Sequence, residues 1–160
     1  MSASRGVIRI DPGTNGGVTV NGWDRGDMLV RARIETAADT DAEARDYLAN
    51  ENCSPAWYYK YLRDNLATYN LLRIFKPTDA MPDAELTWQK CLELMVISGG
   101  PKRVLDQLVA LMDQLGYFGT LLVTQKDWDD PALHKKSMRL LAEQVMPKLA
   151  AHAESRQAAQ

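Results

Sequence analysis

The chain is poor in the residues that build the commonest metal and disulfide sites. It has two histidines and two cysteines among 160 residues. Cys53 and Cys91 form no CxxC pair and have no histidine nearby, so zinc-binding spacing is absent. We therefore predict no metal site, and two free buried thiols rather than a disulfide.

Long apolar runs and an excess of basic residues are also lacking. No apolar stretch approaches the roughly 20 residues of a membrane-spanning helix, and no apolar signal core follows Arg5. The formal net charge is −2, which argues against an electrostatic nucleic-acid surface. Hydrophobic residues make up 46%, which is enough for a core. We expect a cytoplasmic globular protein that binds neither nucleic acid nor membrane.

The first 50 residues are strand-like and rich in turns. Val7–Ile10, Val18–Val20 and Leu29–Glu35 are short or alternating apolar segments, separated by turns of Gly, Asn and Asp. The pattern predicts a three-stranded antiparallel β-meander with one wet face. Thr40 and Glu43 have the spacing of a capping box, which predicts a helix start.

A change of composition near Asn50 gives the predicted division of the chain. We expect a β-meander plus short helix over residues 1–50, a helical and α/β segment over 51–150, and a frayed tail over 151–160.

An aromatic helix is predicted just after this boundary. Ser54 can cap it, with Pro55 at its first position. The stripe that includes Trp57, Tyr61 and Tyr69 recurs at helical spacing and predicts a packing face. Cofactor stacking is the alternative for this stripe.

Residues 96–149 form a helix, strand, loop and helix in the sequence pattern. Residues 98–101, SGGP, open the first helix, whose amides could hold an anion such as a flavin phosphate. A plain Ser-capped start is the alternative. The apolar run over residues 118–124 predicts a strand covered on both faces, and Pro147 should weaken the end of the last helix.

Three carboxylates and a histidine follow that strand. Asp127, Asp129 and Asp130 could suggest a metal site, but neighbouring side chains in a loop diverge and EF-hand spacing is absent. Loop and N-cap roles are therefore predicted. His134 has no visible partner for general-base chemistry, so we predict a surface histidine.

From about Pro55 to Leu149 the chain resembles the C-terminal part of the luciferase-like (LLM class) flavin-dependent monooxygenases, in the limonene-monooxygenase-like branch. The matching motifs are PAWYYKYLRDNLATYNLLRIFK, VISGGPKRVLDQLVAL and GYFGTLLVTQKDWDDPALHKKSMRLLAEQVMPKL. Residues 5–45 resemble, more distantly, the repeating β-strand segments of adhesin domains.

The resemblance implies a (β/α)8 barrel that uses reduced FMN, or a related deazaflavin, and oxygen to oxidise small organic substrates. It makes residues 118–124 the last barrel strand and puts the following loop at the mouth, where active sites of such barrels lie. No catalytic residue is assigned. The residues predicted to bind the cofactor are Gln125, Lys126, Asp127, Trp128, Ser98, Gly99 and Gly100.

The matching segment is shorter than a whole barrel. A (β/α)8 barrel needs roughly 250 residues, whereas the resemblance covers about 95. The predicted fold class is α+β, with an N-terminal antiparallel β-meander followed by a mostly helical partial (β/α) barrel. The predicted function is a truncated or rearranged flavin monooxygenase, a fusion in its arrangement. The alternative is a non-catalytic interaction or scaffold module, in which a partner or a second copy, as in a homodimer, covers the exposed apolar faces of Trp57, Tyr61 and the barrel helices.

Overall fold

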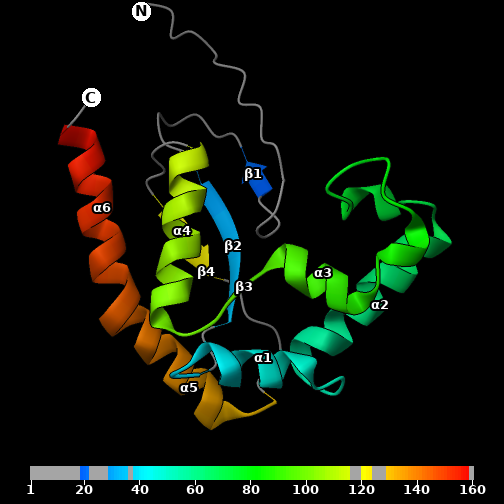
Figure 1. Ribbon diagram of the computed structural model, residues 1–160, viewed down its shortest axis with the longest axis horizontal. Coiled ribbons are helices and arrows are strands. Elements are labelled where there is room, and N and C mark those ends of the chain that lie inside the picture. Colours follow the sequence, from blue (N-terminus) through cyan, green and yellow to red (C-terminus); the bar gives the residue numbers. More distant parts are fainter. Residues whose placement is uncertain (1–18, 22–28, 36–37, 116–119, 124–128, 159–160) are drawn as a thin grey trace, which may run out of the picture.

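The computed structural model describes residues 19–21, 29–35, 38–115, 120–123 and 129–158 (Figure 1). The strands are β1 (Thr19–Asn21), β2 (Leu29–Glu35), β3 (Val96–Ser98) and β4 (Thr120–Val123). The α-helices are α1 (Asp41–Ala49), α2 (Ser54–Thr68), α3 (Trp88–Met95), α4 (Pro101–Leu115), α5 (Pro131–Leu140) and α6 (Met146–Ala158). Two 3₁₀ turns, Leu72–Ile74 and Asp83–Glu85, lie between α2 and α3, and a π-helical turn, Leu141–Val145, joins α5 to α6.

β2 is the strand with which every other described strand pairs. It runs antiparallel to β1, with Val20 opposite Val30. It runs parallel to β4, with Val30 opposite Leu121, and parallel to β3, with Ile34 opposite Ile97. β2 therefore joins the N-terminal segment to strands that follow it by about 60 and 90 residues.

The predicted fold class, with its N-terminal antiparallel meander, is wrong. The antiparallel pairing that the described residues contain is between β1 and β2, and the other two partners of β2 are parallel strands from later in the chain. Alternation along Leu29–Glu35 identified a strand, but a period of two says nothing about which strands flank it. The first predicted strand, Val7–Ile10, lies outside the described residues.

One hydrophobic cluster, the sheet core, packs helices onto the strands. The apolar side of α4 faces this cluster, and its residues Val104, Leu108, Leu111 and Met112 are buried. Figure 1 shows α4 and α6 side by side along the strands. The buried members of the sheet core are Ile97, Val104, Leu108, Leu111, Met112, Leu141, Val145 and Leu149.

A second cluster, the helical core, fills the space between α2 and α3. Val96 belongs to it, whereas the next residue, Ile97, belongs to the sheet core. Successive residues of a strand point to opposite faces, so the two faces of β3 serve the two cores. The buried members of the helical core are Cys53, Ala56, Tyr59, Leu72, Leu86, Cys91, Leu92, Leu94 and Val96.

Both cysteines are buried thiols, as predicted, and no disulfide joins them. Burial raises the pKa of Cys91 to about 11, although the nearby Arg63 acts in the opposite direction. A thiol with such a pKa stays protonated at neutral pH and is a poor nucleophile.

The face of α2 that was predicted to pack is partly exposed. Tyr59 is 6% exposed and packs in the helical core, whereas Trp57 is 60% exposed and Tyr61 57%. The rings of Trp57 and Tyr61 stack on each other, with centroids 5.6 Å apart. The aromatic stripe predicted as a packing face therefore lies partly at the surface, because Ala56 and Tyr59 supply the buried contacts of this helix.

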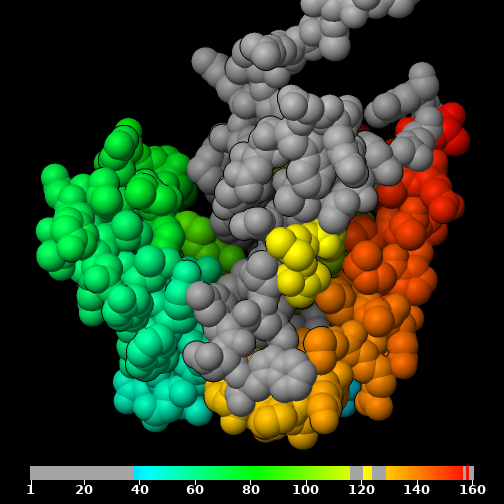
Figure 2. Space-filling view, turned by 180° about the vertical axis from the view of Figure 1, so that it is seen from behind, coloured from blue at the N-terminus to red at the C-terminus, as the bar shows by residue number. Residues whose placement is uncertain are grey.

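β4 is covered on one face only. Leu121 and Val123 pack against the sheet core, whereas Leu122 between them is 39% exposed. The prediction that this strand is covered on both faces is wrong. Figure 2 shows β4 at the surface, between the α2–α3 lobe on one side and α5 and α6 on the other.

The last helix passes through Pro147 instead of ending there. Proline lacks an N–H and collides with the carbonyl four residues earlier, which usually kinks a helix. Here the π turn over Leu141–Val145 lies directly before it, and a π turn is a common accompaniment of a helix irregularity. The fraying predicted for residues 151–160 remains a prediction, with α6 helical as far as Ala158.

The predicted division at residue 50 also remains a prediction, although β2 and α1 both contact elements beyond it. None of the helices in the described part of the chain combines the length and hydropathy that a membrane crossing requires.

Candidate functional site

The carboxyl ends of the parallel strands lie at one edge of the sheet. β2 and β3 run in the same direction in register, from Arg33 beside Val96 to Glu35 beside Ser98. The helices α1 and α4 begin shortly after these two strand ends. In parallel α/β folds, binding sites form at this edge, because loops from several strands converge there. The edge therefore contains the candidate site.

Gly99 makes a tight turn at the end of β3. Its φ of +139° is a conformation that L side chains rarely adopt. A Cβ at this position would lie 2.7 Å from Cδ of Arg103 and 2.9 Å from Oδ1 of Asp41. The glycine thus allows α1 and α4 to approach each other closely at the site.

The N-terminus of α4 already holds an anion from this chain. The Gly100 N–H donates a hydrogen bond of 2.7 Å to Oδ1 of Asp41, which lies in the first turn of α1. A carboxylate therefore takes a donor that was predicted to serve a flavin phosphate. A phosphate at this amide would have to displace Asp41, so the amide itself does not fit that group.

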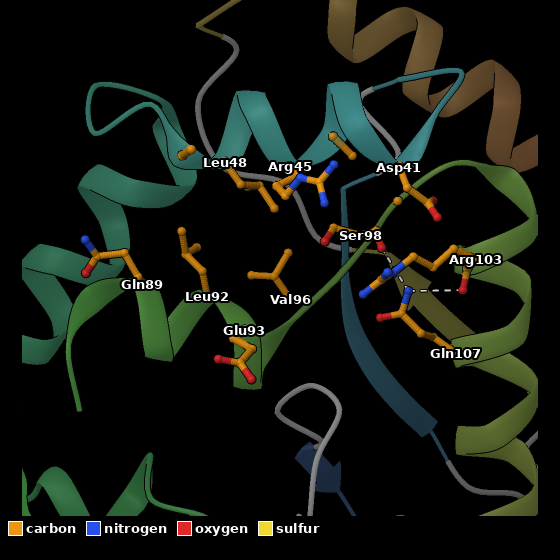
Figure 3. Close-up of a pocket in the computed structure, with 13 residues that line it drawn as sticks. Asp41, Arg45, Leu48, Gln89, Leu92, Glu93, Val96, Ser98, Arg103 and Gln107 are labelled. Atoms are coloured by element: carbon orange, nitrogen blue, oxygen red, sulfur yellow. Dashed lines mark hydrogen bonds between the residues drawn. The ribbon is translucent and has the colours of Figure 1, made fainter. Parts of the chain in front are cut away.

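A pocket of about 470 Å³ lies beside this turn, between α1, α3, β3 and α4. Val96 and Ser98 line it, which places it on the face of β3 opposite the sheet core. Figure 3 shows Arg45 extending from α1 and Arg103 from α4. The lining residues that carry polar side chains are Asp41, Arg45, Gln89, Glu93, Ser98, Arg103 and Gln107.

Gln107 fixes the wall of the pocket on the α4 side. Its Nε2 donates hydrogen bonds to the carbonyl oxygens of Ser98, at 2.9 Å, and Arg103, at 3.1 Å. These bonds tie the end of β3 to the first turns of α4. The apolar part of the pocket comes from Leu48, Leu92 and Val96.

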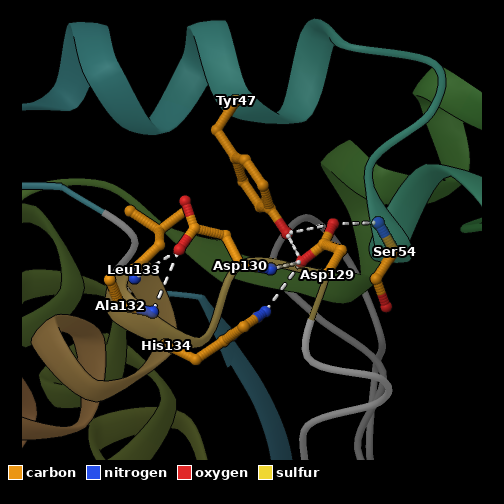
Figure 4. Close-up of polar contacts among 7 residues, drawn as sticks. All are labelled: Tyr47, Ser54, Asp129, Asp130, Ala132, Leu133 and His134. Carbon is orange, nitrogen blue, oxygen red and sulfur yellow. Dashed lines mark hydrogen bonds and ion pairs between the residues drawn. The ribbon is translucent and has the colours of Figure 1, made fainter.

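A second polar cluster surrounds Asp129, ahead of α5 (Figure 4). Its carboxylate accepts hydrogen bonds from the Ser54 N–H at 2.7 Å and from the Tyr47 hydroxyl at 3.1 Å. His134 Nε2 lies 2.8 Å from Oδ1 of the same group. Asp129 thereby connects α5 with α1 and the start of α2, although it lies 82 residues from Tyr47 and 75 from Ser54 in the sequence.

Burial raises the pKa of Asp129, but hydrogen bonds outweigh that effect. Donors from Ser54, His134 and Tyr47 favour the charged form, so that the pKa falls below its ordinary value. Asp129 is therefore ionised at neutral pH and acts as an acceptor for its neighbours.

The predictions for this region have mixed outcomes. His134 is 3% exposed, so the prediction of a surface histidine is wrong. The N-cap role of Asp130 is confirmed, because its Oδ1 accepts from the Ala132 and Leu133 N–H groups. Ser54 does not cap α2 with its side chain, and its N–H is instead satisfied by Asp129.

The predicted cofactor residues are only partly within the described chain. Ser98 and Gly99 line the pocket, and Gly100 lines a neighbouring open depression. The remaining predictions, Gln125, Lys126, Asp127 and Trp128, lie outside the described residues. Within the described ranges, no group of three or more His, Cys, Asp or Glu is arranged to hold a metal ion.

Sequence reasoning missed Arg45, Arg103 and Gln107 as pocket residues. Arg103 and Gln107 are four residues apart on α4, which places them on one side of that helix. This spacing was a usable signal. Arg45 gave none, because its place opposite α4 depends on the parallel pairing of β2 with β3.

Comparison with known proteins gives an informative structural likeness. No family model and no curated protein matches the chain. A solved structure that resembles it is a type II Baeyer–Villiger monooxygenase, the oxygenating constituent of 3,6-diketocamphane monooxygenase from Pseudomonas putida, in complex with FMN. The identity is 25% and the TM-score 0.62, over 75% of this chain and 33% of that one.

The extent of this likeness bears on the N-terminal segment. Three quarters of the 160 residues is about 120, whereas residues 55–160 number only 106. The matched part must therefore include residues upstream of Pro55, where the family resemblance in sequence was predicted to begin. The chain spans about a third of the length of the monooxygenase that it resembles, and its fold is flavin-monooxygenase-like.

Proposed function

We propose that this chain is a truncated or rearranged flavin monooxygenase, which contributes the carboxyl-edge site of a partial barrel. The observation that carries the proposal is the likeness to a monooxygenase in complex with FMN, at 25% identity over 75% of the chain. The parallel pairing of β2 with β3 and β4 supports it, because barrels of this kind are built from parallel strands.

In this proposal FMN, when bound, supplies the redox chemistry, and a small organic molecule is the substrate. The residues of this chain bind and orient the flavin and the substrate. Ser98 and Gly99 form part of the wall, and Gln125 to Trp128, which follow β4 in the sequence, are proposed as further contacts. Because Asp41 occupies the Gly100 amide, the phosphate is proposed to lie toward Arg45 and Arg103. A cytoplasmic location remains the prediction from sequence.

Flavin titration tests the proposal directly. FMN at roughly 1 to 50 μM would be titrated with the protein, and quenching of flavin fluorescence would be measured with and without a reductant. Saturable quenching is expected. Absence of binding over the whole range, in both redox states, would contradict the proposal. Riboflavin, which lacks the phosphate, is the matched ligand control.

A second candidate function is an interaction module that pairs with another copy of itself. The observation that favours it is the stacked, exposed pair Trp57 and Tyr61 on α2. Exposed aromatic residues that lie together often mark a binding surface. Analytical ultracentrifugation would show a dimer that dissociates in a Trp57→Ala, Tyr61→Ala double variant. A monomer at all concentrations would contradict this candidate.

A further inference from the structure

The charges that line the pocket beside Gly99 are unequally satisfied. Asp41 is bound to the Gly100 N–H, and Glu93 lies 2.8 Å from the Lys90 ammonium. The guanidinium groups of Arg45 and Arg103, by contrast, have no hydrogen bond or ion pair within the part of the chain that the structure describes. Among the charged groups that line this pocket, the two guanidinium groups are therefore the ones without a hydrogen-bonding partner in the described residues.

The two guanidinium groups come from different elements and border the same cavity. Arg45 lies on α1 and Arg103 on α4, and Figure 3 shows the backbone of Ser98 between them. Each guanidinium carries several N–H donors in a planar fork, which suits the oxygens of a carboxylate or phosphate. Two such groups on one rim can hold one anion from two sides.

The remainder of the pocket is suited to an apolar body. Leu92 and Val96 are buried members of the helical core, and Leu48 packs against that core from α1. The cavity volume of about 470 Å³ lies in the range of small-molecule sites. A bare inorganic anion would leave this apolar surface in water.

We propose that the pocket between α1, α3, β3 and α4 binds a small organic anion. Arg45 and Arg103 hold its carboxylate or phosphate group, and Leu48, Leu92 and Val96 contact its apolar body. This inference rests on the proposed function, because it names the class of ligand that the proposed flavin site would bind. Its probe is not a flavin, however, so that the two can fail separately.

The test is equilibrium dialysis of the full chain against 1-naphthyl phosphate, with 1-naphthol and inorganic phosphate as partial ligands. Because both features contribute, 1-naphthyl phosphate should bind about tenfold or more tightly than either partial ligand. Its affinity should fall as salt is raised from about 50 mM, since the contact is ionic. Equal binding of 1-naphthyl phosphate and 1-naphthol would overturn the inference, as would no binding of either.

Three sets of variants locate the binding. Arg45→Gln and Arg103→Gln should each weaken binding of 1-naphthyl phosphate about tenfold, because each removes a charge-assisted contact. Arg73→Gln, on the 3₁₀ turn after α2, is the matched control and should leave affinity unchanged. Undiminished binding in the Arg45→Gln, Arg103→Gln double variant would overturn the proposal. So would loss of binding in the Trp57→Ala, Tyr61→Ala variant, which would place the ligand on α2.

Folding and flavin binding are checked in parallel. Neither guanidinium has a hydrogen bond or ion pair to lose within the described residues, so the melting temperature of the double variant should match the wild type. Binding of 1-naphthyl phosphate without binding of FMN would support the pocket and contradict the flavin proposal. Binding of FMN that the arginine variants do not weaken would do the reverse.

Discussion

The two hydrophobic cores differ in how regularly their buried residues recur along the helices. The sheet core is aliphatic, and its members on α4 recur at three- and four-residue steps. The helical core mixes Tyr59, two cysteines and residues of short turns, and its helix α2 leaves two large aromatic side chains at the surface. β3 serves both, through Ile97 on one face and Val96 on the other. Where regular helices pack on strands, the helical repeat of apolar residues thus identifies the members of the core. Where the core is built from short irregular elements, it does not.

The largest expected effect comes from emptying one core at a time. Leu108→Ala in the sheet core and Leu86→Ala in the helical core both remove fully buried side chains. Each should cost about 2–5 kcal/mol of unfolding free energy, through lost transfer energy and a residual cavity. Chemical unfolding followed by circular dichroism and by tryptophan fluorescence would measure it.

The same pair of variants tests whether the cores unfold together. Of the four tryptophans, Trp57 and Trp88 lie on the helices of the helical core. In a Trp23→Phe, Trp128→Phe background, fluorescence therefore reports on that region, while circular dichroism reports on all helices. Coincident transitions in both variants would indicate one cooperative unit. Separate transitions would show that shared packing on β3 does not couple them. Leu108→Met and Leu86→Met, which conserve volume, should cost less than about 1.5 kcal/mol.

Substitution of Asp129 should have the next largest effect on stability, because its carboxylate contacts three helices, α1, α2 and α5. Asp129→Ala would leave the Ser54 N–H and the Tyr47 hydroxyl without this acceptor and would remove the contact to His134. The expected cost is about 1–3 kcal/mol, since the group is only partly buried. Asp130→Ala, which loses a helix cap alone, should cost about 1 kcal/mol and serves as the control.

The Asp129 contribution should also depend on pH in a defined direction. Its folded-state pKa is lowered, so the carboxylate stabilises the fold above the ordinary carboxyl pKa of about 4. That stabilisation is lost as pH falls through the lowered value. The stability difference between wild type and Asp129→Ala should therefore narrow below about pH 4. A difference that stays constant to pH 2 would contradict the ionic role of this group.

How far the sequence predicted the molecule depends on the range of the interactions involved. The capping box of Thr40 and Glu43 and the N-cap of Asp130 are local, and both were predicted correctly. The parallel partners of β2 are long-range, and the fold class predicted from this strand was wrong. The partner of His134, Asp129, is only five residues away, but the prediction of a surface histidine was also wrong, because His134 is buried in the folded chain. A strand period does not name its neighbours, and a polar residue on a helix is buried only when tertiary contacts satisfy it.

The candidate site shows the same limit. Ser98 and Gly99 were found from a Ser-Gly-Gly-Pro turn, which is a local signal. Arg45 and the Asp41 carboxylate reach the site only because β2 and β3 align α1 with α4. Arg45 and Asp41, which help decide what the pocket can hold, were thus residues that the sequence could not place at the site.

Gly99→Ala should have an effect of similar size to Asp129→Ala, at the turn that follows β3. The φ of +139° is strained for alanine, and the added Cβ would press on Arg103 and Asp41. A cost of about 1–3 kcal/mol is expected from the backbone strain. Thermal unfolding would measure it, with Gly100→Ala as a comparison, since that position meets its nearest atom at 3.1 Å without a positive φ. Equal costs for both would show that crowding, rather than φ, sets the effect.

The smallest effects are expected on the outer side of α2. Tyr59→Ala removes a buried ring from the helical core and should cost about 3–5 kcal/mol, as for other large aromatic truncations. Trp57→Ala and Tyr61→Ala, on the same helix, should each change stability by no more than about 0.5 kcal/mol, because more than half of each side chain is in water. Chemical unfolding of all three variants at a concentration where the protein is monomeric gives the comparison. If Trp57→Ala proved as costly as Tyr59→Ala, the stacked pair would be part of the core, and the surface available to a second copy would be correspondingly smaller.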